Sequence, residues 1–424
     1  MPIDEIKNVL YVGAGTMGCY NSLVSAMAGY DVVLYDTSPD ALAASIQRQK
    51  DWIPRLIELK RADEKIIEVA IENIFRTTDL VKAAGNADLL SESVFEQRDL
   101  KRKVHQELDR LLPPHAIMTT NTSTLLISEI EDVVQRGDKF AAMHYHQPSP
   151  LVDLMPGPRT SDRTMDILKR FTLSQGQVFV EMKKERPGYI HNALYSRLLG
   201  SAMFLAALGL GTVEDIDRAW MISQNTKAGP FGMMDYVGLN VVYDATKANM
   251  EKADGNEEMK GLILDLIKPL IDRGDLGIKT GRGFYHYPDP AFIQPEFTAG
   301  CEPVPELKEA LVYAVFSEAM LMVQEGFAVV EDVDRCWMLT HNPKWGPFGM
   351  IDREGLEIVK ERIEERGRQL NFLAEEAGKI ADFLQGYIGK GYLGEKSGRG
   401  FYIYPDPAYS RKDFISFNNQ RSVR

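Results

Sequence analysis

Three motifs in the second half of the chain occur twice at one fixed separation. The pairs are "EDIDRAW" from Glu214 and "EDVDRCW" from Glu331, "GPFGMMDYVGL" from Gly229 and "GPFGMIDREGL" from Gly346, and "KTGRGFYHYPDPAF" from Lys279 and "KSGRGFYIYPDPAY" from Lys396. Each pair is separated by 117 residues. A constant separation over several motifs indicates that one folding unit has been duplicated. We therefore predict two copies of one domain, at residues 187–296 and 297–424.

The first 186 residues follow a different pattern. Short apolar runs alternate with amphipathic stretches, and the runs are "NVLYVGAG", "DVVLYD", "ADLLSESV", "AIMTTNTS", "FAAMHYH" and "QVFVEM". Strands separated by helices predict crossover units and a parallel sheet that is covered on both faces. After Pro187, long helical patterns with few strand signals take over. The chain is thus expected to form an α/β doubly wound Rossmann-type domain over 1–186, followed by two all-α domains.

The composition excludes several classes of partner. The 424 residues are 44% hydrophobic and carry a net charge of −12, with a pI of about 5.2. Nucleic acid and anionic membranes both require a clustered positive field, so neither is an expected partner. The acidic N-terminus does not resemble a signal peptide, and no apolar run reaches the roughly 18 residues of a membrane span. The three cysteines have no metal-ligand spacing and fit a reducing compartment, so we expect a soluble cytoplasmic protein.

A nucleotide-binding pattern lies near the N-terminus. Gly13, Gly15 and Gly18 form G-x-G-x-x-G directly after an apolar run and before a helical pattern. Glycine there allows a tight turn, close approach of the backbone to a pyrophosphate, and close helix packing. The second apolar run ends in Asp36, where a carboxylate accepts hydrogen bonds from an adenosine ribose and repels a 2′-phosphate. Neither of the next two residues is an arginine, so the sequence favours NAD over NADP.

Further segments carry a family resemblance. Together with the nucleotide pattern, "ADLLSESVFE", "NTST", "RPGYIHN" and "GPFGMMDYVGL" resemble the L-3-hydroxyacyl-CoA dehydrogenase family over nearly the whole chain. The resemblance implies helical domains of the 6-phosphogluconate-dehydrogenase-like C-terminal type. Two helical copies are similar to the dehydrogenase part of multifunctional fatty-acid oxidation proteins, where the second copy can take the place of a dimer partner. A homodimer and a monomer both remain open.

The resemblance also implies site residues. Those for NAD are Gly13, Gly15, Thr16, Met17, Gly18, Asp36, Glu96, Lys101, Asn121 and Gln147. Ser123 resembles the serine that bonds the substrate oxygen, and Asn192 resembles an asparagine that reaches the same substrate. The residue 117 positions after Asn192 is Glu309, so one active site, using the first copy, is implied.

Oxidation of a secondary alcohol needs a base for the hydroxyl proton while hydride leaves the same carbon, and histidine suits this task. Family members open the base motif as His-Phe-Phe-Asn-Pro, and here the run is His144-Tyr145-His146-Gln147-Pro148. His144 follows Ser123 by the 21 residues typical of the family, so it is the expected base. His146 fills an aromatic position, where it either touches substrate or packs with a bonded ring. His144, His146 and Asp153 could also be metal ligands, but NAD chemistry needs no metal and none is expected.

The acid that orients the base departs from the family pattern. The usual glutamate lies twelve residues after the base, and that position here is Pro156. The run "LVDLMPG" matches the family's Leu-Val-Glu-Val-Val-Pro-Gly if three residues are deleted after Pro150. Asp153 then takes the glutamate's place. Either a shortened loop brings Asp153 to His144, which we favour, or the dyad is broken.

Three functions follow. The leading prediction is an NAD-dependent oxidoreductase that interconverts a 3-hydroxyacyl-CoA and a 3-ketoacyl-CoA. The first alternative is a dehydrogenase of a free 3-hydroxy acid, as in the gulonate and carnitine dehydrogenases of the family. The second alternative is an NAD-binding scaffold without catalysis. The substrate partner is accordingly an acyl-CoA or a free 3-hydroxy acid.

Overall fold

The structure is a computed structural model that describes residues 3–252, 257–412 and 414–416. Contacts along the chain divide it into two compact units. The sheet unit comprises Met1–Ile190, Gly326–Thr340 and Ala408–Arg424, and the helical unit comprises His191–Glu325 and His341–Pro407. The three domains expected from the sequence, 1–186, 187–296 and 297–424, stay a prediction.

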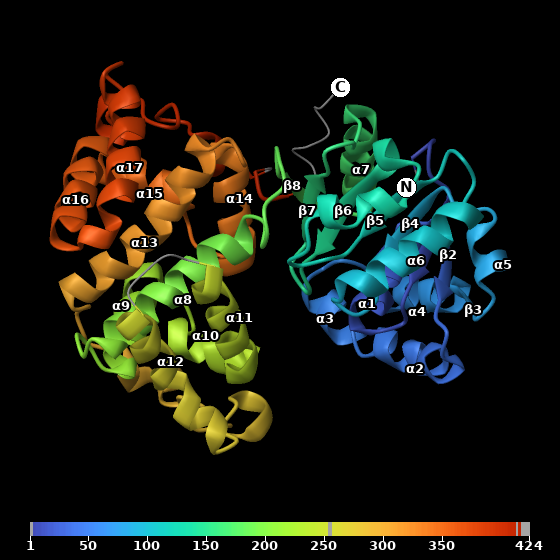
Figure 1. Ribbon diagram of the computed structural model, residues 1–424, viewed down its shortest axis with the longest axis horizontal. Helices are drawn as coiled ribbons and strands as arrows, with labels where there is room; N and C mark the ends of the chain where they lie inside the picture. The colour runs from blue at the N-terminus through green and yellow to red at the C-terminus, as the bar shows by residue number, and fades with distance from the viewer. Residues whose placement is uncertain (1–2, 253–256, 413, 417–424) are drawn as a thin grey trace. The chain divides into compact units, whose positions relative to one another are not determined.

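The sheet unit is built on one mixed eight-stranded sheet (Figure 1). The strands are β1 Asn8–Val12, β2 Asp31–Tyr35, β3 Phe75–Thr77, β4 Leu89–Glu92, β5 Ile117–Thr120, β6 Phe140–Tyr145, β7 Leu151–Pro156 and β8 Val178–Glu181. Their order is β3-β2-β1-β4-β5-β6-β7-β8. β1 to β6 all run parallel to one another, β7 is antiparallel to β6, and β8 is parallel to β7. The first six strands give the doubly wound arrangement, whose ligand crevice lies at the carboxyl ends of the strands.

The apolar runs do not predict two of the strands, β3 and β7, and β7 also departs from the wholly parallel sheet that the alternation predicts. β3 is only three residues long and includes an arginine, so it has no apolar run to reveal it. β7 reads Leu-Val-Asp-Leu-Met-Pro, with a charge inside and a proline at the end, yet its first five residues are buried. β7 lies between two other strands and runs against β6 because a short hairpin joins them. This hairpin carries the residues of chemical interest.

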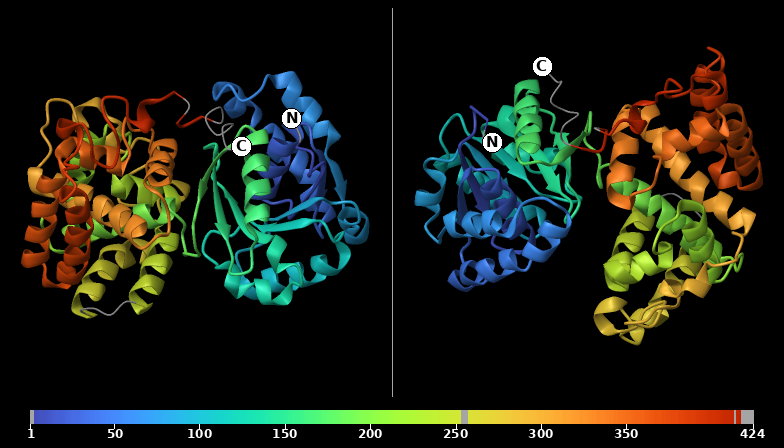
Figure 2. Two further views of the ribbon diagram at one scale, coloured as in Figure 1. Left: turned by 90° about the horizontal axis from the view of Figure 1, so that it is seen from above. Right: turned by 180° about the vertical axis from the view of Figure 1, so that it is seen from behind.

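Helices cover both faces of the sheet (Figures 1 and 2). They are α1 Thr16–Met27, α2 Pro39–Lys50, α3 Ile53–Glu58, α4 Glu64–Asn73, α5 Leu80–Ala84, α6 Arg98–Leu111 and α7 Asp162–Ser174, with short 3-10 turns at Ile127–Glu129, Glu131–Val133 and Gly137–Lys139. α1 and α7 are tied together where Gln175 Nε2 donates to Ser25 Oγ at 2.5 Å. α6 is strongly amphipathic and buries Lys101, His105 and Leu108. Amphipathic helices of this kind supply the apolar layers that a two-faced sheet needs.

A helix from the second repeat copy belongs to the sheet unit. α14 covers Val330–His341, and all but its last residue lies in this unit. The backbone N–H of Lys183 donates to Phe327 O at 2.7 Å, and that of Glu181 donates to Asp332 Oδ2 at 3.2 Å. These bonds occupy N–H groups at and just after β8, the last strand of the sheet.

The helical unit contains most of the rest of both copies. Its helices are α8 His191–Ala207, α9 Val213–Gln224, α10 Pro230–Val237, α11 Leu239–Lys252, α12 Glu257–Asp272, α13 Pro305–Gln324, α15 Pro347–Glu354, α16 Leu356–Gln369 and α17 Ala374–Ile388, with 3-10 turns at Ile278–Thr280, Ala291–Ile293, Pro295–Phe297, Asn371–Leu373 and Glu395–Ser397. α9 to α12 begin 117 residues before α14 to α17. The longest helices of the two copies, α8 and α13, pack side by side (Figure 1).

The repeated glycine-rich motif forms the same turn in both copies. The Asp235 carboxylate accepts backbone N–H groups from Phe284 and Tyr285, both at 2.9 Å. A side chain on Gly283 would place its Cβ 2.0 Å from Asp235 Oδ1, so only glycine fits. In the second copy, Asp352 accepts from the corresponding N–H groups at 2.8 and 2.9 Å. The motif therefore binds its turn to a buried aspartate.

In the parts of the chain that the structure describes, no helix combines the length and apolar character needed to cross a bilayer.

Candidate active site

The glycine-rich turn between β1 and α1 leaves room for a phosphate group. Gly13 has a φ of 102°, and a Cβ there would lie 2.7 Å from Ser93 O. A Cβ on Gly18 would lie 1.8 Å from Gly13 O, so the helix and turn touch directly. A Cβ on Gly15 would meet nothing within 4 Å. The space beside Gly15 opens at the N-terminus of α1, where Thr16 and Met17 form the first turn and no side chain caps the helix.

Asp36 follows β2 and is held next to this turn. Its Oδ2 accepts the Ala14 N–H at 2.7 Å, and its Oδ1 accepts the Ser38 N–H at 2.9 Å. Arg48 of α2 also reaches the turn, with Nη1 donating to Ala14 O at 2.8 Å. The nucleotide pattern does not predict Arg48, because the pattern ends at Asp36 and Arg48 lies near the end of the following helix, α2. The fixed carboxylate and open glycine turn fit the adenosine end of a dinucleotide.

His144 and Asp153 face each other across the β6–β7 hairpin. They are direct partners in the antiparallel register. His144 Nδ1 lies 3.1 Å from Asp153 Oδ2, and His144 Nε2 lies 3.1 Å from Ser123 Oγ. Asp153 is fully buried and His144 is 8% exposed. The structure thus aligns hydroxyl, imidazole and carboxylate, with the short β6–β7 connection bringing the acid to the histidine.

His146 shares the same carboxylate. Its Nε2 lies 2.6 Å from Asp153 Oδ2, and its ring is edge-on to the His144 ring at 4.5 Å between centroids. Ligand atoms of the three residues all lie within 4.8 Å of one another, a geometry that a metal ion also accepts. The interpretation of His146 as a bonded ring agrees with this placement. The absence of a metal stays a prediction.

Burial and the shared carboxylate set the charges of this cluster. Burial lowers the pKa of His144, the neighbouring His146 lowers it further, and Asp153 opposes both effects. Burial alone would raise the pKa of Asp153, but the two imidazoles hold it well below its ordinary value. At neutral pH, Asp153 is therefore ionised and His144 is neutral. A neutral imidazole whose Nδ1–H donates to a carboxylate presents Nε2 as the proton acceptor.

Tyr189 packs against one face of the His144 ring. Its ring stacks on His144 at 5.1 Å with 5° between the planes, and its hydroxyl donates to Thr122 O at 2.8 Å. Tyr189 lies within the motif "RPGYIHN", but the sequence alone does not indicate its role. A buried aromatic beside a motif residue was the available signal, but nothing in the local pattern pairs it with a histidine 45 residues earlier.

Glu96 orders the loop that carries Ser123. Its Oε1 accepts the N–H groups of Ser123 at 2.8 Å and Thr124 at 3.0 Å, and also bonds the Thr122 hydroxyl. Its Oε2 lies 3.4 Å from Lys101 Nζ. This loop follows β5, at the carboxyl edge of the sheet.

Lys101 is fully buried, and its ammonium lies between two carboxylates. Nζ is 2.8 Å from Glu92 Oε1, and Glu92 Oε2 also bonds His105 at 3.1 Å and Thr120 at 2.7 Å. Burial would raise the pKa of Glu92, but bonds to His105 and Lys101 lower it to about 2. The sequence interpretation missed Glu92, although an acid in the buried strand "LLSE" signals a paired charge.

The remaining predicted residues occupy distinct places. Asn121 Oδ1 accepts the Tyr145 N–H at 2.9 Å, which joins the ends of β5 and β6. Gln147 Nε2 donates to Thr16 O at 3.2 Å, beside the glycine turn. Asn192 is the second residue of α8 and belongs to the helical unit.

Family profiles match most of the chain. The profile described as "3-hydroxyacyl-CoA dehydrogenase, NAD binding domain" matches residues 8–186. The profile described as "3-hydroxyacyl-CoA dehydrogenase, C-terminal domain" matches twice, at residues 188–287 and 308–404.

Individual proteins give the same result. The mitochondrial hydroxyacyl-coenzyme A dehydrogenase of Rattus norvegicus is 34% identical over 296 residues, covering 66% of this chain and 91% of its own length. A probable 3-hydroxybutyryl-CoA dehydrogenase of Bacillus subtilis is 31% identical, with 67% and 98% covered. The solved structure of a diketoreductase that acts on dicarbonyl compounds has 33% identity and a TM-score of 0.61 over 67% of this chain and all of its own. The 3-hydroxybutyryl-CoA dehydrogenase of Escherichia coli has a TM-score of 0.75 over 90% of this chain and 99% of its own, at 19% identity, which shows likeness of fold.

Proposed function

The chain belongs to the 3-hydroxyacyl-CoA dehydrogenase family, and we propose that His144 is the general base of its reaction. The protein is an NAD-dependent oxidoreductase that interconverts a 3-hydroxyacyl-CoA and a 3-ketoacyl-CoA. The observation that supports the role of His144 is the hydrogen-bonded series from Ser123 Oγ through both ring nitrogens to Asp153 Oδ2.

His144 and Asp153 divide the proton chemistry. With its Nδ1–H donated to Asp153, neutral His144 accepts the substrate hydroxyl proton at Nε2. The carboxylate then stabilises the imidazolium, and in the reverse reaction Nε2 returns the proton to the ketone oxygen. NAD, when bound at the glycine turn and Asp36, would supply the hydride acceptor for this reaction. Tyr189 keeps the ring from turning by stacking on it.

Ser123 and Asn192 are proposed to hold the substrate. The Ser123 hydroxyl already lies within hydrogen-bond distance of His144 Nε2, so a substrate oxygen that bonds both groups would be aligned for proton transfer. Glu96 fixes the backbone of Ser123 and so preserves this alignment. Asn192 supplies an amide to the same substrate, as its match to the family asparagine suggests.

The residues proposed for NAD fit its two ends. Gly13, Gly15, Thr16, Met17 and Gly18 form the open turn for the pyrophosphate, and Asp36 accepts from the adenosine ribose. Asn121 and Glu96 belong to the strand ends and loops at the carboxyl edge, where the nicotinamide half would lie. Lys101 lies on α6, and its Nζ is 3.4 Å from Glu96 Oε2. Gln147 reaches the first turn of α1.

The experiment is an NADH-formation assay with (S)-3-hydroxyacyl-CoA thioesters and the matching free 3-hydroxy acids. We expect turnover of the thioesters, and an at least tenfold lower kcat/KM for the free acids. Turnover of the free acids alone would favour the alternative of a 3-hydroxy-acid dehydrogenase. NAD binding without turnover of either class would contradict the proposed role of His144.

A further inference from the structure

The cluster around Asp153 holds more donor atoms than the reaction needs. Asp153 Oδ2 bonds His144 Nδ1 at 3.1 Å and His146 Nε2 at 2.6 Å. Asp153 Oδ1 is buried and has no hydrogen-bond partner among the residues that the structure describes. A base and its orienting acid require one imidazole and one carboxylate oxygen. The second imidazole and the second carboxylate oxygen therefore need a separate explanation.

The cluster arises from two departures from the family pattern. The family motif His-Phe-Phe-Asn-Pro has an aromatic residue at the position of His146, and Asp153 stands in place of a glutamate on a hairpin that is three residues shorter. The short hairpin pairs Asp153 directly with His144. The His146 N–H donates to Leu151 O at 3.1 Å, so the pairing continues past β6 and keeps His146 on the same side as His144. Together the two departures produce a set of three ligands.

This donor set suits a divalent transition metal. Zn²⁺ binds histidine nitrogen at about 2.0–2.1 Å and carboxylate oxygen at about 2.0–2.2 Å, which in a tetrahedron places the ligand atoms roughly 3.3 Å apart. The ligand atoms of His144, His146 and Asp153 all lie within 4.8 Å of one another, so small side-chain movements complete the geometry. Imidazole nitrogens favour zinc and its neighbours over Mg²⁺ and Ca²⁺, which prefer oxygen ligands.

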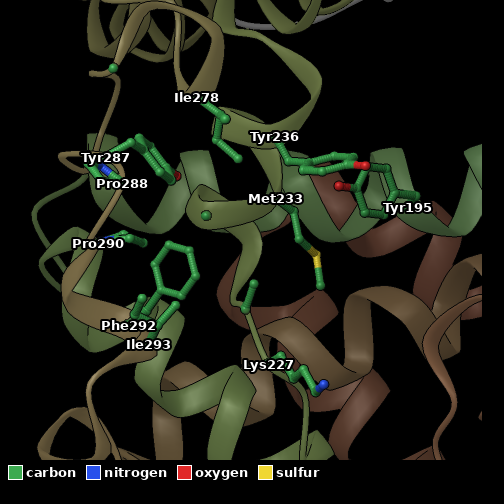
Figure 3. A pocket seen from close by; sticks show the side chains of 13 residues that line it. Tyr195, Lys227, Met233, Tyr236, Ile278, Tyr287, Pro288, Pro290, Phe292 and Ile293 are labelled. Carbon is green, nitrogen blue, oxygen red and sulfur yellow. The ribbon is translucent and has the colours of Figure 1, made fainter. Parts of the chain in front are cut away.

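The described residues offer a metal ion no second group of this kind. The apolar pocket of the helical unit, about 730 Å³ in volume, is a contrast: Figure 3 shows Tyr195, Met233 and Phe292 around it, and its lining contains no carboxylate or imidazole. The three ligands of the cluster all lie in the sheet unit. The two histidine side chains are 10% and 13% exposed, so the cluster is not sealed from solvent.

We propose that His144 Nδ1, His146 Nε2 and the Asp153 carboxylate form an inhibitory site for Zn²⁺ or a similar ion from solution. The ion is an inhibitor and not a cofactor of the reaction. A metal on Nδ1 occupies its lone pair, so the proton of the neutral His144 ring moves from Nδ1 to Nε2, and the ring neither gains nor loses a proton. Nε2, which lies 3.1 Å from Ser123 Oγ, then carries a proton and cannot accept one from the substrate. The inhibition rests on the proposed role of His144 as base, whereas the binding of the metal does not.

The first test measures Zn²⁺ binding to the full chain by calorimetry, without substrate. We expect one equivalent to bind, with an affinity that falls at least about tenfold in His146→Phe, because even residues that only support a ligand are worth about 10–100-fold in metal affinity. His146→Gln is a second variant, whose amide can still donate to Asp153 but does not replace an imidazole as ligand. Equal Zn²⁺ affinity in the wild type and in both variants would overturn the proposal.

A matched control removes the exposed groups that also attract zinc. His115 is an exposed histidine next to Asp88, and Cys301 is the exposed thiol. The double variant His115→Ala, Cys301→Ser should bind Zn²⁺ with the wild-type affinity. Loss of the tight equivalent in this variant would place the metal at the surface and overturn the proposal.

The second test follows NADH formation at saturating NAD and substrate while Zn²⁺ is raised, at a pH on the plateau of each variant's profile. We expect kcat of the wild type to fall about 10²-fold or more, the lower end of what a general base contributes, and to recover when EDTA is added. Each variant is compared with its own metal-free rate. His146→Phe should need at least about tenfold more Zn²⁺ for half inhibition. Mg²⁺ should not inhibit, and equal inhibition of the wild type and His146→Phe by Zn²⁺ would overturn the proposal.

The two tests together separate this proposal from the proposed function. An active enzyme that binds no Zn²⁺ at this cluster refutes the metal site alone. Zn²⁺ binding that depends on His146 but leaves kcat unchanged keeps the metal site and refutes the role of His144 as base, because a metal on Nδ1 would leave Nε2 protonated.

Discussion

One carboxylate oxygen of Asp153 accepts hydrogen bonds from two imidazoles, at 3.1 Å from His144 and 2.6 Å from His146. Aspartate suits this place because it lies directly opposite His144 on a paired strand, where Cβ atoms approach to about 4.5–5.5 Å. A glutamate would carry one methylene more than this short gap needs. The substitution of aspartate for the family's glutamate thus goes with the shorter hairpin.

We expect Asp153→Asn to lower kcat by about 10²- to 10⁴-fold, the range typical of general acid–base assistance. The asparagine amide has the same shape but no negative charge, so it is a weaker acceptor for the Nδ1–H of His144 and for the His146 ring. His144 therefore loses the interaction that favours its productive tautomer. NADH formation under saturating NAD and substrate measures the effect. His144→Ala is the companion variant and should be at least as inactive. An unchanged kcat in Asp153→Asn, with His144→Ala inactive, would remove Asp153 from the dyad.

His146 should affect the pH at which activity is lost on the acidic side of the pH profile, because it lowers the pKa of the base His144. The groups facing His144 are His146, Asp153, Ser123, Tyr189 and, at longer range, Glu96. Burial first, then His146, lower the pKa of His144, so the neutral base persists below its ordinary pKa and activity is lost only as the pH falls through the lowered value.

In His146→Phe, the Asp153 carboxylate interacts with His144 alone, and the pKa of His144 should rise. The acidic limb of log kcat/KM against pH for alcohol oxidation should therefore move to higher pH. Phenylalanine is the family's residue at this position, which makes it a mild replacement. An unmoved limb would mean that His146 only packs.

The residues of this site could be predicted from the sequence to different extents. His144, Ser123 and Asp153 were accessible because motif order and spacing identify them. Tyr189 and Glu92 were not, because stacking and a buried ion pair join residues that are distant along the chain, and local patterns carry no such information.

The β6–β7 hairpin shows the corresponding limit for elements. Alternation of apolar runs predicts six of the eight strands and their winding. It predicts Asp153 on a loop rather than on a strand, since the register of a hairpin depends on pairing and not on the composition of one segment. The consequence of the three missing residues is a tight connection from His146 to Pro150, which places the acid opposite the base.

The end of β2 should determine the choice of dinucleotide. Asp36 would lie against a 2′-phosphate, and like charges at contact cost several kcal/mol. Asp36→Ser removes this repulsion and leaves Arg48 near the turn, so the ratio of kcat/KM for NADP to that for NAD should rise at least about tenfold. Asp40→Ser, an exposed acid in the first turn of α2, is the control and should leave the ratio unchanged. If Asp36→Ser leaves this ratio of kcat/KM unchanged, the adenosine ribose does not bind at Asp36.

The aspartate-bound turns should contribute equally to stability in the two copies. Asp235→Asn and Asp352→Asn each leave one backbone N–H without its carboxylate acceptor, which costs about 1–3 kcal/mol. Both variants should lower the thermal midpoint by similar amounts without changing the KM for NAD. A raised KM for NAD in Asp235→Asn alone would instead connect the first copy's turn to the cofactor.

For the whole molecule, the repeat predicts two copies but not how they are divided between units. The structure assigns Gly326–Thr340 and the segment from Ala408 onward, both from the second copy, to the sheet unit. Helical periodicity marks the apolar face of a segment without specifying the surface that covers it. The distribution of one copy over two units is therefore invisible in the sequence.

From this distribution we expect the sheet to depend on the second copy. β8 is an end strand, and the N–H groups of Glu181 and Lys183 donate to Asp332 and Phe327. A chain truncated after residue 297 loses these partners, and it also loses α13, which packs against α8 and α9. Unpaired strand edges and uncovered apolar helices associate with other chains.

We expect the truncated chain to dimerise or precipitate, and the full chain to behave as a monomer, when both are measured by size-exclusion chromatography with light scattering. Co-expression of residues 298–424 should restore a soluble one-to-one complex. A truncated chain that stays monomeric, with the melting temperature of the full chain, would show that the sheet unit does not depend on the second copy.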